Sequence, residues 1–331
     1  MMRHATRRAA LLGAAALLGS QDARAQAPSW VPERPLRIVV PFPAGGSLDV
    51  QTRMIAERLS PALGQPVVID NRPGAGGTIG AAEAARAAPD GHTLLMATNG
   101  IMAANVALFA GRLPYDPVAD FVPVTLLTNY PQIVAVAGWP EGGDRSFAGL
   151  LEALRARRDP ASFGSSGQGS PTHLAGEMFA RALGIPLVHV PYRGQAPALN
   201  DLIAGQTQLM FPSVADVLGQ LRAGRVHAVA AMTPQRIALL PEVPTLAELG
   251  HPGLVSSIWG ALYARAGTPA AAITRLGAEV RRILDVPEIR QRLEEQGFEV
   301  RPGTPAALAA LQAEETARLG ALIRAAGIRA E

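Results

Sequence analysis

The segment IVVPFPAGGSLD, residues 38–49, joins an apolar run to a glycine- and serine-rich turn and then to an amphipathic helix. A second segment, FGSSGQGSPTHL at residues 163–174, has the same order of turn and helix. Such a turn leaves unpaired backbone N–H groups at a helix start, where the helix dipole also favours negative charge. If the two segments lie on separate lobes, they form a clamp for a small anion.

The rest of the chain alternates short apolar runs with helical segments. Apolar runs rich in β-branched residues are typical of strands covered on both faces. They occur at residues 36–41, 67–70, 93–97, 122–127, 133–137, 187–190, 208–211 and 226–231. Helical spacing occurs at 50–63, 79–88 and 197–204, and 270–328 is mostly helical with breaks near 287 and 297–305. This pattern predicts an α/β fold with mainly parallel sheets.

The first 25 residues have the composition of an export signal. MMRHATRR is a basic start, residues 9–19 form an apolar run too short to span a bilayer, and residues 23–25 (ARA) offer a cleavage site. We predict cleavage after Ala25 or after Ala27, with both the general and the twin-arginine export routes open. The mature protein is then periplasmic. At about 305 residues it exceeds a comfortable single core, so two domains are expected.

Charge and composition exclude several classes of function. Without the signal's four arginines and one aspartate, the 30 basic and 27 acidic side chains become 26 of each, which points to no nucleic-acid or anionic-membrane partner. The chain has no lysine, so a Walker A, Schiff-base or kinase lysine is absent, and it has no cysteine for disulfides, thiol chemistry, metal binding or a lipid anchor. No cofactor is expected.

Candidate catalytic and metal motifs are incomplete. Ser166, His173 and Asp201 can be arranged as a hydrolase triad, but the Gly-x-Ser-x-Gly pattern is absent, which favours serines as turn and cap donors. The histidines have no metal-ligand spacing. The glycines of residues 74–77 lack the third glycine of a dinucleotide-binding turn, since residue 79 is isoleucine. A structural turn is the better interpretation there.

The helix starts are predicted from their caps. Ser170 followed by Pro171 is a strong N-cap signal, and Ser47 can cap the first helix in the same way. Asp49 falls in the first turn of that helix, where it either caps its own turn or points into the anion site. Both alternatives are open from the sequence.

The motifs assembled above resemble the Bug-type extracytoplasmic solute receptors, the binding-protein component of tripartite tricarboxylate transporters. The resemblance is carried by long segments such as RPLRIVVPFPAGGSLDVQTRMIAERL and VPYRGQAPALNDLIAGQ. These segments lie at residues 34–59, 64–100, 163–179, 190–206, 240–250 and 287–300.

The resemblance implies a two-lobed periplasmic binding protein of the type II, Venus-flytrap class, with a hinge between the lobes. Lobe 1 would comprise residues 26–128 and 251–331, and lobe 2 would be an insertion of residues 129–250. Hinge segments are expected at residues 126–134 and 256–261. The implied partners are a small carboxylate ligand and the integral-membrane permease subunits, with the receptor itself a monomer.

The resemblance also implies a site built largely from backbone groups of the two glycine-rich turns. We predict ligand contacts at Phe42, Ala44, Gly45, Gly46, Ser47, Asp49, Thr98, Asn99, Ser165, Ser166, Gly167, Ser170, Thr172, Tyr192, Arg193 and Ser213. For Arg193, pairing with a ligand carboxylate and simple surface solvation are equally open.

One departure bears on the ligand. Where the family commonly has aspartate directly after a phenylalanine, this chain has Pro212 after Phe211. A ligand with an ammonium group would lose an anionic partner there, so a mono- or dicarboxylate without an amino group is expected. A periplasmic hydrolase or lyase acting in the same cleft, and a receptor that presents its ligand to a sensor protein, are the alternatives to transport.

Overall fold

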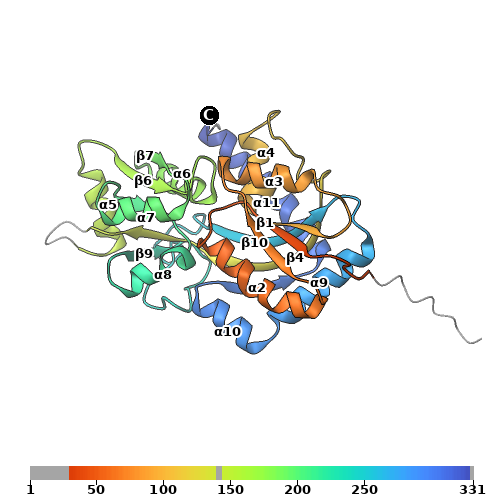
Figure 1. Cartoon of the computed structure of the whole chain (residues 1–331). Coiled ribbons are helices and arrows are strands. Elements are labelled where there is room, and N and C mark those ends of the chain that lie inside the picture. The colour runs from red at the N-terminus through yellow and green to blue at the C-terminus, as the bar shows by residue number, and fades with distance from the viewer. Residues whose placement is uncertain (1–29, 139–143, 329–331) are drawn as a thin grey trace, which may run out of the picture.

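The computed structural model describes residues 30–138 and 144–328, which form two sheets with their helices (Figure 1). The predicted export signal, residues 1–25, lies outside the described residues. The α/β class is as predicted, and the two sheets lie side by side in two lobes. The prediction of mainly parallel sheets is wrong, because each sheet also contains antiparallel pairs where the chain crosses between the lobes and returns.

The first sheet has six strands in the order β11-β4-β10-β3-β1-β2. β1 is parallel to β2 and β3, whereas β10 runs antiparallel to β3 and β4, and β11 antiparallel to β4. The strands are β1 (Leu36–Val40), β2 (Val67–Asn71), β3 (Thr93–Thr98), β4 (Phe121–Pro131), β10 (Ser257–Arg265) and β11 (Glu299–Gly303).

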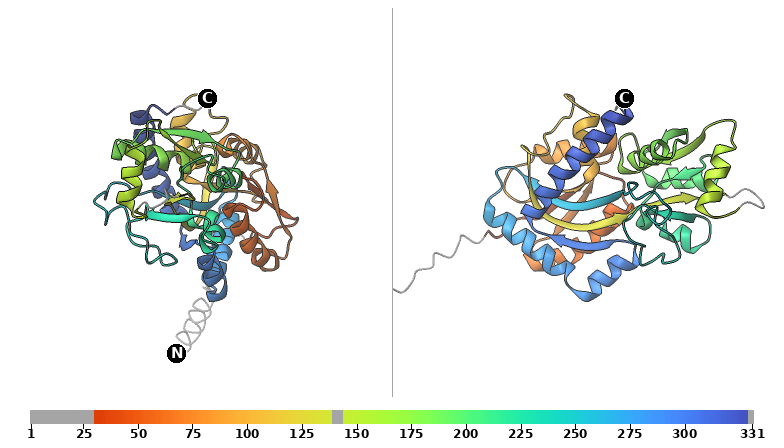
Figure 2. Two further views of the ribbon diagram at one scale, coloured as in Figure 1. Left: turned by 90° about the vertical axis from the view of Figure 1, so that its left-hand side faces the viewer. Right: turned by 180° about the vertical axis from the view of Figure 1, so that it is seen from behind.

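Helices cover both faces of the first sheet. The side chains of Leu36, Ile38 and Val40 pack on one face against α2 (Ser47–Leu63), α9 (Ala270–Leu284) and α10 (Pro287–Glu295), and Val39 packs on the other. That second face is covered by α3 (Thr78–Ala85) and α11 (Pro305–Ala326), which crosses the sheet in the rear view (Figure 2). Burial on both faces explains the nearly continuous apolar runs of the inner strands β1 and β3.

The second sheet has five strands in the order β7-β6-β8-β5-β9. β6 is parallel to β7 and β8, and β5 is antiparallel to β8 and β9. The strands are β5 (Ile133–Val136), β6 (Ala161–Ser165), β7 (Leu187–Pro191), β8 (Leu209–Met210) and β9 (His227–Ala231). One face is covered by α5 (Phe147–Arg155) and α6 (Pro171–Leu183), the other by α7 (Gln195–Ile203) and α8 (Val214–Arg222).

Short helical segments follow the strands of the first sheet. They are η1 (Ala75–Gly77), the π-helical η2 (Gly100–Ala104) and α4 (Asn105–Leu108). The sequence analysis did not predict these segments, nor the strands β6, β10 and β11. β11 lies inside the break expected between residues 297 and 305, so that break is a strand and not a loop.

The chain crosses between the sheets at Gln132, the one residue between the end of β4 and the start of β5. Its buried side chain accepts a hydrogen bond from Ser256 Oγ at 2.7 Å and donates one to the Phe211 carbonyl at 2.9 Å. Ser256 directly precedes β10, on which the chain returns to the first sheet. Gln132 therefore ties the outgoing and returning segments together, within the two stretches predicted as hinges.

We expect Gln132→Met to lower the free energy of unfolding by about 2–4 kcal/mol, because it leaves Ser256 Oγ and the Phe211 carbonyl buried without these partners. Urea denaturation followed by circular dichroism measures the change. The control is Gln291→Met on the exposed side of α10, where the glutamine bonds only to Glu295. Equal losses for both variants would contradict a structural role for the Gln132 amide.

Candidate ligand-binding cleft

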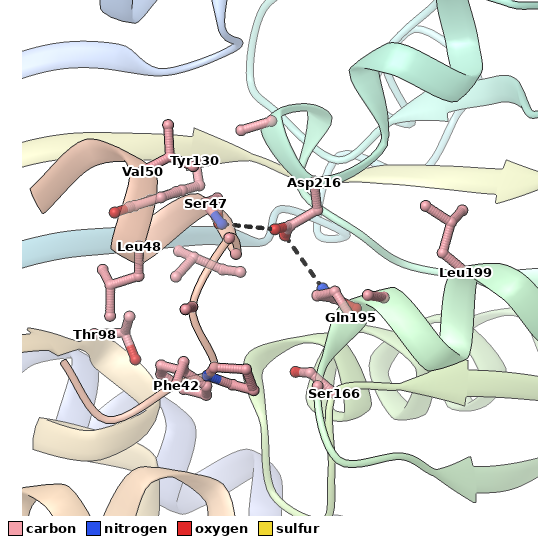
Figure 3. Close-up of a pocket in the computed structure, with 18 of the residues that line it drawn as sticks. Phe42, Ser47, Leu48, Val50, Thr98, Tyr130, Ser166, Gln195, Leu199 and Asp216 are labelled. Atoms are coloured by element: carbon pink, nitrogen blue, oxygen red, sulfur yellow. Dashed lines mark hydrogen bonds between the residues drawn. The ribbon is translucent and has the colours of Figure 1, made fainter. Parts of the chain in front are cut away.

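Two adjoining cavities lie between the lobes. One, of about 360 Å³, surrounds the start of α2 and is called the α2 cavity (Figure 3). The other, of about 710 Å³, is lined by residues 74–77 and is called the glycine-loop cavity. Phe42 and Pro43 of lobe 1, with Ser166, Arg193 and Gly194 of lobe 2, line both cavities and so stand between them.

The two lobes approach closely on either side of the cavities. A Cβ atom on Gly100 of lobe 1 would lie 2.9 Å from Pro171 Cδ of lobe 2, and one on Gly297 would lie 2.9 Å from the Ala215 nitrogen. Glycine at these two positions lets the backbones meet without a side chain between them. The cleft is therefore narrow, and a molecule inside it touches both lobes.

Among the described residues, four helices begin at the wall of the α2 cavity, namely α2, α6, α7 and α8. Ser170 Oγ caps α6, as predicted, and Ser213 Oγ caps α8. In the described part of the chain α2 and α7 receive no side-chain cap at the N-cap position, which is glycine in both. Converging helix N-termini favour an anion, because their partial positive charges add.

The prediction that Ser47 caps α2 is wrong. Gly46 is the N-cap, in an extended conformation, and Ser47 is the first residue of the helix. Asp49 instead accepts hydrogen bonds from the Gly45 nitrogen at 2.9 Å, from Asn71 Nδ2 at 2.9 Å and from Arg53 Nε at 2.9 Å. Asp49 thus holds its own turn, which decides between the two alternatives for its orientation.

The environment of Asp49 keeps it ionised. Burial works to raise the pKa of this carboxyl, but the hydrogen bonds from Arg53, the Gly45 nitrogen and Asn71 outweigh it and hold the pKa below its ordinary value. The carboxylate is 2% exposed and lines neither cavity. It fixes the backbone of the turn that faces the cleft.

Asp216 of α8 was not among the site residues predicted from the sequence. Its Oδ1 accepts a hydrogen bond from the Ser47 nitrogen across the cleft at 3.4 Å, and its Oδ2 accepts from Ser213 Oγ at 2.7 Å and Gln195 Nε2 at 3.3 Å (Figure 3). The signal was present, since Ser213 and Asp216 have the spacing of a capping box. Pro212 does not deprive the cleft of a carboxylate, because Asp216 supplies one a helical turn later.

The serine-rich loop of lobe 2 is held from below by buried hydroxyls. Ser166 donates its N–H to Thr172 Oγ1 at 3.0 Å, and Thr172 also contacts Ser170 Oγ at 3.0 Å. Ser165 Oγ lies 2.6 Å from His189 Nε2. Ser165, Ser170 and Thr172 are buried, so they support the loop while Ser166 faces the cavities.

Two stacked imidazoles form the floor of this loop. The rings of His173 and His189 are 3.7 Å apart at 9°, and the Gly169 N–H donates to His173 Nδ1 at 3.0 Å, which requires that nitrogen to be unprotonated. Burial, and then the neighbouring His173, lower the pKa of His189 to about 3. A neutral His189 therefore supports the loop at physiological pH.

The predicted site residues divide into three groups. Residues lining the α2 cavity are Phe42, Ala44, Gly45, Gly46, Ser47, Thr98, Ser166 and Arg193. Residues lining only the glycine-loop cavity are Gly167 and Tyr192. Asp49, Asn99, Ser165, Ser170, Thr172 and Ser213 line neither cavity.

The residues of the third group make structural contacts near the cleft. Asn99 shows this: its Nδ2 donates to the Ser257 carbonyl at 3.0 Å and to Glu315 Oε2 at 3.1 Å, joining β3 to β10 and α11. Besides Asp216, the sequence analysis missed several residues that line the α2 cavity. They include Leu48, Val50, Tyr130, Gln195, Leu199, Ile258 and Phe298.

The geometry does not assemble the triad considered from the sequence. Ser166 Oγ contacts Thr172 Oγ1, His173 accepts from the Gly169 backbone, and Asp201 accepts from the Tyr192 hydroxyl at 2.6 Å. Residues 30–138 and 144–328 contain no group of three side chains suited to a metal ion. Within the same ranges no helix has the length and apolar content to cross a membrane.

The comparisons with known proteins agree with this geometry. The model of the tripartite tricarboxylate transporter family receptor matches residues 51–328. The chain belongs to this receptor family. The protein BugT of Bordetella pertussis is 34% identical over 298 residues, which cover 90% of this chain and 91% of that protein. The resemblance to Bug-type receptors is thereby confirmed.

Two solved structures of similar chains contain carboxylates. R. palustris Rpa4515 with adipate has a TM-score of 0.86 and 35% identity, covering 90% of the receptor and 99% of that chain. MatC from Rhodopseudomonas palustris with bound malate has a TM-score of 0.80 and 35% identity, covering 88% of this receptor and 99% of that chain. The structure of the periplasmic binding protein BugD has a TM-score of 0.83 and 35% identity, covering 90% of this chain and 99% of that one. With the family match, this likeness confirms the two-lobed periplasmic binding-protein fold and the receptor class.

We expect the stability of the receptor to fall as pH decreases from about 6.5 towards 3. His189 has a lowered pKa in the folded protein, so the unfolded chain takes up a proton first, and stability present above pH 6.5 is lost. The slope is at most about 1.4 kcal/mol per pH unit, and smaller because the ring is partly exposed.

Urea denaturation between pH 7.5 and 4.5 measures this slope, and His189→Phe, which keeps a ring against His173, should flatten it. His227→Phe on β9, outside the loop, is the control and should retain the slope. An unchanged slope in His189→Phe would show that other groups carry the pH dependence.

Proposed function

We propose that the receptor captures a small carboxylate between its lobes in the periplasm and delivers it to the membrane subunits of a tripartite tricarboxylate transporter. The observation that carries this proposal is the convergence of four helix N-termini on the α2 cavity, two of which have glycine at the N-cap position. Carboxylates bound in two structurally similar receptors support the same ligand class.

The backbone of the glycine-rich turn before α2 provides the main contacts to the ligand. Asp49 uses the Gly45 N–H, and Asp216 uses the Ser47 N–H, so the turn already binds carboxylates of its own chain at both ends. A ligand carboxylate uses the same type of group. Exposed Arg193, opposite this turn on lobe 2, supplies a guanidinium for the ligand.

Ligand binding favours closure because the ligand contacts both lobes and only the closed arrangement provides all its contacts. The hinge operates at Gln132 and at Ser256, where the chain passes between the sheets. We assign residues 30–131 with 257–328 to lobe 1 and residues 133–255 to lobe 2, so the boundaries expected at 128/129 and 250/251 move to the crossover residues Gln132 and Ser256. The receptor acts as a monomer after removal of the signal near Ala25, and needs no cofactor.

A thermal-shift screen of the mature protein against small carboxylates, amino acids and sugars tests the proposal. A carboxylate at one hundred times its Kd should stabilise the protein by about 2.7 kcal/mol. With an unfolding entropy of about 2.1 cal/mol/K per residue, that amounts to a rise in Tm of about 4 °C for a mature chain of about 305 residues. Stabilisation by sugars alone would contradict an anion site, and conversion of the ligand during incubation would indicate an enzyme.

We expect Gly46→Asp to weaken carboxylate binding at least 30-fold, because it puts a carboxylate at the start of α2. The backbone tolerates a side chain there: φ is −73°, and the nearest atom to an added Cβ is the Pro43 carbonyl oxygen at 3.5 Å. Gly46→Ala is the matched control and should bind within about threefold of the wild type by isothermal titration calorimetry. Equal weakening in both variants would indicate a steric effect and not a charge effect.

A further inference from the structure

Only two side chains that line the described cavities carry a formal charge. They are Arg193, which lines both, and Asp216, which lines the α2 cavity. Arg193 is exposed, and none of the carboxylates of the described residues lies within 4.0 Å of its guanidinium nitrogens. The cleft thus offers one cation and one fixed anion to an incoming ligand.

Asp216 is held in place by three elements. The Ser47 N–H of α2, the Ser213 hydroxyl at the start of α8 and the Gln195 amide of α7 all donate to its carboxylate. The side chain is half-buried, so water screens its charge only in part. Its carboxylate also uses an N–H group at the start of α2 that a ligand anion would otherwise take.

The remaining wall of the α2 cavity is largely apolar. Leu48 and Val50 of α2, Tyr130 of β4 and Leu199 of α7 lie around it (Figure 3). Ile258 and Phe298 also line it. The hydroxyl of Tyr130 is already used, since it donates to Gln51 Oε1. Such a wall accommodates hydrocarbon and offers no second cation to a second carboxylate.

We propose that Asp216 sets the charge of the ligand and restricts the receptor to monocarboxylates with an apolar body. One carboxylate is stabilised by the α2 and α7 N-termini and by Arg193. A second carboxylate on the same small molecule meets the Asp216 carboxylate and the apolar wall, and like charges in a partly desolvated site repel. This inference rests on the proposed function, because it names the class of carboxylate that the same cleft accepts.

Matched pairs of ligands test it by isothermal titration calorimetry at pH 7.5: butyrate with succinate, hexanoate with adipate, and benzoate with terephthalate. The wild-type receptor should bind the monocarboxylate at least tenfold more tightly within the pair that binds best. Asp216→Asn keeps the shape and an acceptor oxygen but removes the charge, and should reduce that ratio at least fivefold by strengthening the dicarboxylate.

The control is Asp159→Asn, which removes a charge from an exposed turn of lobe 2 that lines neither cavity, and which should keep the wild-type ratio. Equal or tighter binding of the dicarboxylate by the wild type overturns the inference. So does an unchanged ratio in a folded Asp216→Asn protein. If neither member of any pair binds, the proposed function fails and removes the basis of the inference with it.

A second measurement does not depend on a variant. Salt screens repulsion between the dicarboxylate and Asp216, so the wild-type preference for the monocarboxylate should shrink at least threefold between 20 and 500 mM NaCl. A cleft that attracts dianions would show the reverse, because salt would then weaken the dicarboxylate more. A preference that grows or stays constant with salt therefore also overturns the inference.

Discussion

The structure depends on a single buried amide between its two sheets. Gln132 separates β4 from β5 by one residue, and its side chain bonds to Ser256 on the returning segment and to the Phe211 carbonyl. So short a crossover joins the end of an inner strand of one sheet to the start of an inner strand of the other. The two sheets therefore meet end to end, and the loops at the carboxyl ends of β1 and β6 face one another. The position of the anion site follows from this constraint, since both glycine-rich turns lie on those loops.

The helix N-termini that face each other across the cleft repel one another. The starts of α2, α7 and α8 carry partial positive charge, and bringing them together across a narrow gap is unfavourable unless an anion lies between them. Asp216 supplies part of that negative charge from within the chain, by accepting from Ser47 of the opposite lobe. A bound carboxylate supplies the rest. Anion binding and closure of the lobes are thus coupled, because each lobe contributes helix N-termini whose mutual repulsion an anion between them offsets.

The sequence predicted features whose determinants are local. The continuous apolar run at residues 36–41 identified β1, and Ser170 with Pro171 identified the start of α6. β10 was missed because SIWGALYAR combines small and aromatic residues in no simple alternation, although its burial between β3 and β4 decides its conformation. Asp216 was missed for a different reason. Its capping box is visible locally, but its partner Ser47 lies 169 residues away, and only the fold brings them together.

Backbone recognition explains how one turn can serve receptors with different ligands. Backbone N–H groups at the start of a helix are unchanged by most side-chain substitutions, so any carboxylate meets the same kind of donor at the start of α2. Discrimination must then come from side chains on the opposite lobe, where α8 places a residue against that turn. A carboxylate at position 216 lowers the negative charge that a bound ligand can carry. It leaves the helix starts unchanged, because Ser213 still caps α8. The side chain at position 216 selects the charge of the ligand, whereas the backbone at the helix starts recognises the carboxylate itself. The first can change by substitution without altering the second.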